Sequence, residues 1–260
     1  MDLAIKKAKD MGVGWVSARG CNHYGIAGYY AMRAMKQGLI GFCFTNTSPC
    51  VVPTGAAQTA IGTNPISCAA SGTQSDMVLD MATTTVALGR VEIHQRAGLA
   101  IGHSWGVDHE GVPTQDASAI LHGGGLMPLG GDEASYKGYG LAMMVEVISA
   151  ILSGATFGAN VVGWRSGRVA ANLGQCFIAV DPAKFCPGFE GRMDELIAMM
   201  HGLRVARGAT EVLVPGEPEQ RRQAYAKEHG VPIHVNVVRA LDKLANELGI
   251  EPLSSNALAP

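Results

Sequence analysis

The first half of the chain alternates between two hydrophobic periods, and this alternation predicts an α/β fold. Apolar residues at helical spacing predict helices, and short apolar runs bounded by glycine or polar residues predict strands. In chain order the pattern predicts a helix over residues 2–10, a strand over 12–18, a helix over 27–37, strands over 39–46, 66–70 and 77–79, and a helix over 82–94.

The second half contains long loops and the clearest helix. Residues 46–65 are rich in Gly, Thr, Pro and Ser, and residues 95–135 are mostly loop. Loops of this length are uncommon unless they are functional. We expect a mixed sheet flanked by helices. The remaining predicted elements are a helix over 138–152, a strand over 177–180, a helix over 189–207, a strand over 211–214, and helices over 217–229 and 234–248.

Composition and charge narrow the function classes. The net charge is −2, and Lys and Arg are scattered, whereas a nucleic-acid-binding face needs clustered basic residues. The longest apolar run, residues 140–152, is interrupted by Glu146 and is too short to cross a bilayer. The six cysteines form no Cys-x-x-Cys pair, which is typical of reduced core residues. We therefore expect a cytoplasmic protein without nucleic-acid or membrane partners.

His23 is the first candidate for chemistry, because it follows a predicted strand and precedes a predicted helix. A loop at that position exposes the side chain while the strand fixes the backbone. The imidazole titrates near neutral pH and suits acid or base catalysis. An isolated histidine is more often a capping or surface residue, so the motif alone leaves both interpretations open.

Other polar residues in the loops suit ligand binding, and each has an ordinary structural explanation as well. Thr47 follows a strand and can bind an amide or a phosphate, or simply form a turn. Asp80 is placed to cap the helix predicted over 82–94. Lys137 stands at the start of the helix predicted over 138–152, where an anion is favoured, or it is a solvated lysine.

Two further kinds of site are weakly indicated. The glycine-rich stretches at 123–125 and 130–131 do not stand between a strand and a helix, so the Gly-x-Gly-x-x-Gly dinucleotide fingerprint is not matched. His103, Asp108 and His109 form a cluster that suggests a metal-dependent hydrolase. The spacing of these three residues does not provide a third convincing ligand on a helix or strand, so we expect no metal site.

The order of these segments resembles the type 2 malate/L-lactate dehydrogenase family over nearly the whole chain. The matching motifs are Asn-His-Tyr-Gly at 22–25, Thr-Asn-Thr-Ser-Pro at 45–49, Gly-Thr-Asn-Pro at 62–65, Leu-Asp-Met-Ala-Thr-Thr at 79–84, Trp-Gly-Val-Asp at 105–108, Tyr-Lys-Gly-Tyr-Gly-Leu at 136–141 and Val-Pro-Gly-Glu at 214–217.

The resemblance implies a non-Rossmann dinucleotide-binding fold and hydride transfer between NAD or NADP and a small 2-hydroxy or 2-oxo acid, in a homodimer. By the same resemblance His23 is the catalytic acid and base, positioned by its neighbours Asn22 and Tyr24, and Asp108 shapes the substrate side. The positions that match the family's cofactor-binding residues are Thr47, Asp80, Met81, Ala82, Lys137, Gly216 and Glu217.

The resemblance also sets the expected domains. We expect an NAD(P)-binding catalytic domain over residues 1–230 and a C-terminal helical segment over 231–260. The family's N-terminal helical segment carries a Ser-His-Gly motif and a substrate-binding arginine. This sequence contains no Ser-His-Gly, so we expect that segment to be absent. Two alternatives follow: an active 2-hydroxyacid dehydrogenase, or a shortened member that keeps the scaffold and binds dinucleotide without turnover.

Overall fold

The computed structural model describes residues 1–163 and 169–256. The described chain forms two compact units, the first covering Met1–Gly216 and the second beginning at Glu217. The predicted boundary at residue 230 lies inside the second unit, between its first two helices. The cofactor-binding role of residues 1–230 stays a prediction. Residues 257–260 of the predicted C-terminal segment lie outside the described residues.

A five-stranded sheet forms the centre of the first unit. Its strand order is β1-β7-β2-β3-β4, and each neighbouring pair of these strands is antiparallel. The predicted fold class, a sheet flanked by helices, is confirmed, and the parallel pairs of a mixed sheet do not occur among these five strands. The strands are β1 (Val13–Cys21), β2 (Ile40–Thr45), β3 (Ile66–Ser71), β4 (Asp76–Met81) and β7 (Leu173–Val180).

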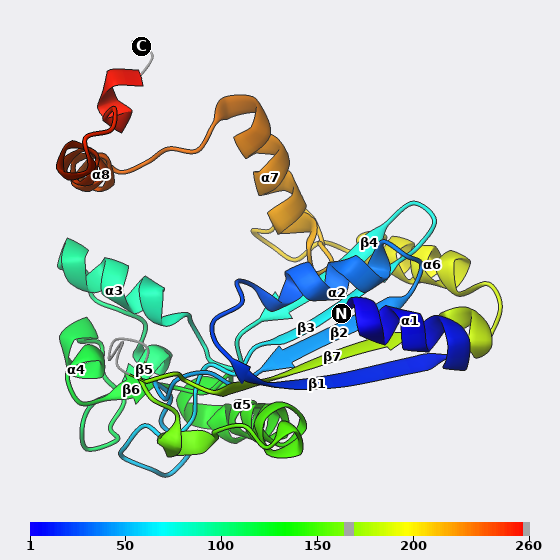
Figure 1. Cartoon of the computed structure of the whole chain (residues 1–260), viewed down its shortest axis with the longest axis horizontal. Coiled ribbons are helices and arrows are strands. Elements are labelled where there is room, and N and C mark those ends of the chain that lie inside the picture. Colours follow the sequence, from blue (N-terminus) through cyan, green and yellow to red (C-terminus); the bar gives the residue numbers. More distant parts are fainter. Residues whose placement is uncertain (164–168, 257–260) are drawn as a thin grey trace. The chain divides into compact units, whose positions relative to one another are not determined.

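Helices α1 (Asp2–Met11) and α2 (Ala27–Met35) cover one face of this sheet (Figure 1). Small residues on these helices allow close packing: Ala4, Ala8 and Ala34 are fully buried against Cys43 and Ala179 of the strands. Glycine in the strands serves the same purpose. A Cβ at Gly41 would overlap the carbonyl group of Ala31, so α2 lies directly on β2 only because that position has no side chain.

Helix α5 (Gly131–Val145) and a following π-helical turn, η2 (Glu146–Ile151), cover the other face (Figure 1). Here Val145 packs against Phe44 and Cys176, which point to the opposite side from Cys43 and Phe177 as strand alternation requires. Gly174 of β7 lets the π turn approach, because a Cβ there would lie 2.5 Å from the Cα of Ala150.

A second cluster of buried residues, among them Val51, Val91 and Leu126, lies between the loops and the shorter elements. The helix predicted over 82–94 begins only at Leu88. Thr83 donates from its backbone N–H and its hydroxyl to the carbonyl of Thr63, which holds this stretch extended. The shorter elements are α3 (Leu88–Ala97), η1 (His103–Trp105), β5 (Gly106–Val107), α4 (Ala117–Leu121), β6 (Gly125–Leu126) and η3 (Gly158–Asn160).

Other element bounds also differ from the sequence prediction, and β7 begins at Leu173, before the predicted residue 177. Helix α5 begins at Gly131, before the predicted residue 138, and contains a non-helical residue, Ala134. Residues 211–214 do not form a strand, and the carbonyl oxygen of the following Pro215 accepts the N–H of Val78 in β4. Helix α6 (Phe189–His201) ends before the predicted residue 207, and η4 (Pro182–Lys184) precedes it.

The second unit is helical. It contains α7 (Glu217–His229), α8 (Val235–Leu248) and η5 (Leu253–Asn256), as the sequence pattern predicts for its first two helices. His234 caps α8, since its Nδ1 accepts the N–H of Asn236. Among the described residues, none of the helices combines the length and the apolar character that a membrane span requires.

Candidate active site

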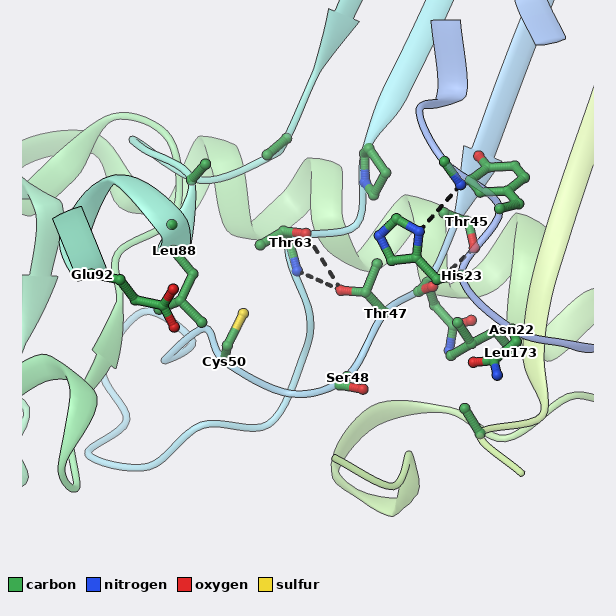
Figure 2. A pocket seen from close by; sticks show the side chains of 18 residues that line it. Asn22, His23, Thr45, Thr47, Ser48, Cys50, Thr63, Leu88, Glu92 and Leu173 are labelled. Atoms are coloured by element: carbon green, nitrogen blue, oxygen red, sulfur yellow. Dashed lines mark hydrogen bonds between the residues drawn. The ribbon is translucent and has the colours of Figure 1, made fainter. Parts of the chain in front are cut away.

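A pocket of about 510 Å³ opens beside the end of β1, the loop that connects β2 to β3, and the segment that leads from β4 into α3. Its walls are largely apolar, with a few hydroxyl, amide and imidazole groups directed inward, as in ligand-binding pockets generally. His23 lies near the middle of Figure 2, and Cys50, Leu88 and Glu92 lie to its left. The polar lining residues are Asn22, His23, Tyr24, Thr45, Asn46, Thr47, Ser48, Thr63 and Glu92.

His23 is exposed on the loop between β1 and α2. Its Nδ1 accepts the backbone N–H of Gly25 at 3.2 Å, so in the neutral ring the proton resides on Nε2. The loop itself is anchored from β7, because the side chain of Gln175 donates to the carbonyl oxygen of Asn22 at 3.0 Å. The backbone is thus fixed while the imidazole remains accessible from the pocket.

Tyr24 follows His23 and anchors the same loop to β2 and α2. Its hydroxyl lies 3.2 Å from the thiol of Cys43, and its ring stacks on Tyr30 with centroids 4.7 Å apart. Burial raises the pKa of the Tyr24 hydroxyl above its usual value. Tyr24 is therefore neutral at physiological pH and acts as an apolar and hydrogen-bonding support for His23.

Thr47 lies where the two ends of the loop between β2 and β3 meet. Its hydroxyl accepts the backbone N–H of Thr63 at 2.9 Å, and its own N–H donates to the side chain of Asn64 at 3.2 Å. Gly62 makes this approach possible, because a Cβ there would overlap Thr47. These bonds place two threonine side chains on one wall of the pocket, and the cofactor-binding role of Thr47 stays a prediction.

Asp80 has a structural role that differs from the predicted one. It lies in β4, and its carboxylate accepts the N–H of Gly28 in the first turn of α2 at 2.8 Å, so it caps α2 and not the helix that follows it in sequence. Partial burial raises the pKa of Asp80, although the bond from Gly28 opposes this. Gly28 has no room for a side chain, since a Cβ would lie 2.6 Å from Asp80 Oδ2.

The other predicted cofactor residues fall into separate groups. Ala82 lines the pocket. Gly216, with a φ of +100°, packs against Val78 on the outer side of β4, the strand that also carries Asp80 and Met81. Glu217 belongs to the second unit.

Lys137 and Asp108 do not line the pocket. Lys137 is exposed and lies 5.9 Å from the ring of Tyr136, in the first turn after the non-helical Ala134. Asp108 accepts the N–H groups of Glu110 and Val112, and these bonds hold the pKa of its carboxyl below the usual value. It therefore organises its own turn, and its role toward a substrate stays a prediction.

Two alternative chemistries find little support. Among the described residues there is no group of three or more His, Cys, Asp or Glu side chains that could hold a metal ion. His103 faces Asp132, with 3.7 Å between Nδ1 and Oδ2. Cys50 lines the pocket, but burial raises the pKa of its thiol to about 11, so the nucleophilic thiolate is scarce at neutral pH.

Sequence reasoning missed a buried polar cluster beneath the pocket. Asn46 and Asn64 are fully buried, and Glu146 is only 4% exposed. The Asn64 side chain donates to a Glu146 oxygen at 3.0 Å. The interruption of the apolar run 140–152 by a glutamate was the one signal in the sequence. Asn46 and Asn64 stand in polar turns that the sequence does single out, at 45–49 and 62–65, but nothing in those turns indicates a contact with a buried glutamate.

Comparisons with known proteins agree with the motif pattern. Residues 1–242 match the family model described as malate/L-lactate dehydrogenase. The malate dehydrogenase of Pyrococcus horikoshii is 38% identical over 258 residues, covering 97% of this chain and 71% of the relative. The L-sulfolactate dehydrogenase of Methanocaldococcus jannaschii is 40% identical over 252 residues, covering 96% of this chain and 71% of the relative.

A solved structure shows that the fold is similar as well. The sulfolactate dehydrogenase of Methanocaldococcus jannaschii superposes with a TM-score of 0.87, covering 97% of this chain and 72% of that chain. A third relative, named ureidoglycolate dehydrogenase (NAD(+)), from Escherichia coli K12, is 35% identical over 238 residues, covering 90% of this chain and 66% of the relative. Each of these relatives is named as a dehydrogenase.

Proposed function

The chain belongs to the malate/L-lactate dehydrogenase family of oxidoreductases, and we propose that it transfers a hydride between NAD or NADP and a small 2-hydroxy or 2-oxo acid. The observation that carries the proposal is His23, an accessible imidazole on an anchored loop beside a largely apolar pocket of about 510 Å³. Substrates of the malate, lactate or sulfolactate type are the first candidates, since relatives are named for them.

His23 is proposed as the proton donor and acceptor. In the reducing direction it gives a proton to the carbonyl oxygen of the acid, and in the oxidising direction it removes the hydroxyl proton. A bound dinucleotide supplies or accepts the hydride. Protonation of the ring places a hydrogen on Nδ1, so Nδ1 can no longer accept the N–H of Gly25. A Cβ built at Gly25 would have no atom within 4 Å, so the loop is not tightly packed there. The loop therefore has room to adjust when His23 changes charge.

The pocket suits a nicotinamide ring. Pro65, Ala82 and Leu88 provide apolar surface, and Thr47 and Thr63 provide hydroxyl groups for an amide or ribose. Within the described lining there is no Lys or Arg to pair with a substrate carboxylate. We propose Thr47, Asp80, Met81, Ala82, Lys137, Gly216 and Glu217 as cofactor-binding residues, with Asp108 on the substrate side.

The assembly and compartment are also proposals. Exposed apolar residues on α5 and η2, among them Met144, Val147 and Ile151, support a homodimer, because such a surface favours burial against a second copy. The six cysteines are free thiols, which supports a reducing, cytoplasmic compartment. Sedimentation equilibrium of the purified chain tests the dimer: a monomer at micromolar concentration contradicts it.

The decisive experiment separates cofactor binding from turnover. The purified chain is titrated with NADH and with NADPH by calorimetry, and it is then assayed with oxaloacetate, pyruvate and sulfopyruvate. Binding together with oxidation of the cofactor supports the proposal and identifies the preferred pair. Binding without turnover supports the alternative of a family member that keeps the scaffold without catalysis. A folded sample that binds neither dinucleotide contradicts both.

A further inference from the structure

A buried carboxylate lies directly behind the pocket wall. Glu146 is the first residue of the π turn η2 and is 4% exposed. Its Oε1 accepts the side-chain amide of Asn64 at 3.0 Å, and its Oε2 accepts the backbone N–H of Gly158 at 3.4 Å. The side-chain amide of Asn46 is near enough to lower the pKa of this carboxylate. Groups from both ends of the 46–65 loop and from Gly158 thus surround one side chain.

Asn64 connects Glu146 to the pocket. Its side-chain oxygen accepts the N–H of Thr47 at 3.2 Å, and its amide also donates to the carbonyl of Ala142 at 3.1 Å. The backbone of Asn64 has a φ of +36°, which is unusual for a residue other than glycine. A fully bonded side chain explains why this conformation persists. Any shift of the Glu146 carboxylate is therefore transmitted to Thr47, which lines the pocket.

Asn46 provides a second connection, from Glu146 to the strand that anchors the His23 loop. Its side-chain oxygen accepts the N–H of Gly174 in β7 at 2.9 Å, and its amide donates to the carbonyl of Thr156 at 2.9 Å. The next residue of β7, Gln175, holds the carbonyl of Asn22 beside His23. Glu146 therefore connects the Thr47 wall with the strand that supports the His23 loop.

Stability alone does not account for a carboxylate at this place. Burial of a charged group is costly, and a buried polar cluster can often be replaced by apolar residues without loss of stability. Burial here raises the pKa of Glu146 despite the surrounding donors, which shows that its charge is only partly compensated. A π turn inside a helix is itself frequent at functional sites. A buried carboxylate and a π turn are both expected where the precise placement of side chains matters more than the stability of the fold.

We propose that Glu146 is a positioning residue, whose carboxylate holds the two ends of the 46–65 loop so that Thr47 and Thr63 face the dinucleotide. Its kinetic consequences rest on the proposed function, whereas its effect on this loop does not. Glu146 does not line the pocket, so its loss should act on cofactor binding through Thr47.

The first test compares Glu146→Gln with Glu133→Gln, an exposed glutamate in the first turn of the preceding helix. A carboxamide has one acceptor oxygen, so it cannot accept from both Asn64 and Gly158. We expect Glu146→Gln to raise the KM for the dinucleotide about tenfold to a hundredfold, and Glu133→Gln to leave it unchanged. A lowered melting temperature with wild-type KM and kcat indicates a merely structural residue and overturns the proposal.

The second test asks whether Glu146 acts through Asn64. Asn64→Gly removes the amide, and glycine accepts the positive φ without strain. If both residues work through one hydrogen bond, the double variant raises KM no further than the stronger single variant. Additive effects overturn the connection. If Glu146→Gln does not fold, Glu146→Asp, which draws both carboxylate oxygens back by one methylene, takes its place in the first test.

The third test distinguishes failure of this inference from failure of the proposed function. Amide hydrogen exchange is measured on ligand-free wild-type and Glu146→Gln protein. Faster exchange at Thr47 and Thr63 in the variant supports the positioning role, even if neither protein binds a dinucleotide. Unchanged exchange at both residues overturns it, whatever the enzyme assays give.

Discussion

The two faces of the five-stranded sheet are built differently. The face under α1 and α2 is packed mainly with alanine, isoleucine and aromatic side chains, and the polar Ser67 and Asp80 lie toward its β3–β4 side. The face under α5 and η2 also has an apolar cluster, but beside it lie Asn46, Asn64 and Glu146, all buried. The pocket opens next to this polar side.

The difference assigns separate tasks to the two faces. Apolar burial is non-directional and roughly proportional to area, so it stabilises a layer without fixing individual atoms. A hydrogen bond contributes only about 1 kcal/mol net, but it is directional and is expensive to leave unmade when buried. We therefore expect substitutions in the α1–α2 layer to change stability, and substitutions near the pocket to change kinetics.

The largest expected effect is kinetic. His23→Ala should reduce turnover about 10²- to 10⁴-fold, because it removes the proposed proton donor and acceptor. Dinucleotide binding and the melting temperature should stay close to the wild-type values, since His23 is exposed. His122→Ala, an exposed histidine at the end of α4, is the matched control. Turnover of His23→Ala within threefold of wild type contradicts the assigned role.

The next effect is on stability. Gly41→Ala places a methyl group against the carbonyl of Ala31, so α2 has to move away from β2. We expect the free energy of unfolding to fall by about 3 kcal/mol, as measured by urea denaturation. The KM values of the remaining folded enzyme should be unchanged.

Gly140→Ala on α5 is the control for Gly41→Ala, since its position has open space. This substitution should stabilise the helix by about 0.5–1 kcal/mol. Equal losses of stability at the two positions contradict the packing argument.

A smaller loss is expected at the cap of α2. Asp80→Ala removes the acceptor for the N–H of Gly28 and should destabilise the protein by about 1 kcal/mol. Asp80→Asn keeps an acceptor oxygen and should recover most of this loss. The two variants are compared by urea denaturation without ligand. If Asn is as damaging as Ala, the cap depends on charge and not on the hydrogen bond.

The smallest effect is the pH dependence of the same residue. Burial raises the pKa of Asp80 in the folded state, so the folded protein binds its proton more readily than the unfolded chain does. Stability from this group therefore increases as pH falls through the folded pKa and levels off below the unfolded value of 3.8. Between pH 7 and pH 4, wild type should gain stability relative to Asp80→Asn. A relative loss contradicts this direction.

The apolar layer could be predicted from sequence, and the polar one could not. Helices α1 and α2 and strands β2 and β3 follow from local hydrophobic periods, within a few residues of the predicted bounds. The same method placed the start of α3 six residues too early, at residue 82 and not at Leu88. The hydrogen bonds of Thr83 with Thr63 override the local helix preference there. Tertiary hydrogen bonds have no signature in a single local window.

The candidate site shows the same limit. Family resemblance brought out His23, Thr47 and Ala82, which do line one pocket. Asp80 was assigned to the wrong helix, because its true partner, Gly28, lies 52 positions away in the chain. Asn64 and Glu146 are 82 positions apart, and only the folded structure shows that they meet. The cofactor roles of Lys137 and Glu217 stay predictions.

The place of β7 has a consequence for synthesis on the ribosome. This strand lies between β1 and β2, although it is the last of the five sheet strands to be synthesised. Val13 of β1 and Ile40 of β2 both pair with Val180 of β7. Until residues 173–180 leave the exit tunnel, β1 has no partner in the sheet and β2 pairs on one side only. Such long-range pairing slows folding and leaves strand edges exposed to other chains. The nascent protein is therefore most vulnerable to aggregation in the interval before its seventh strand is complete.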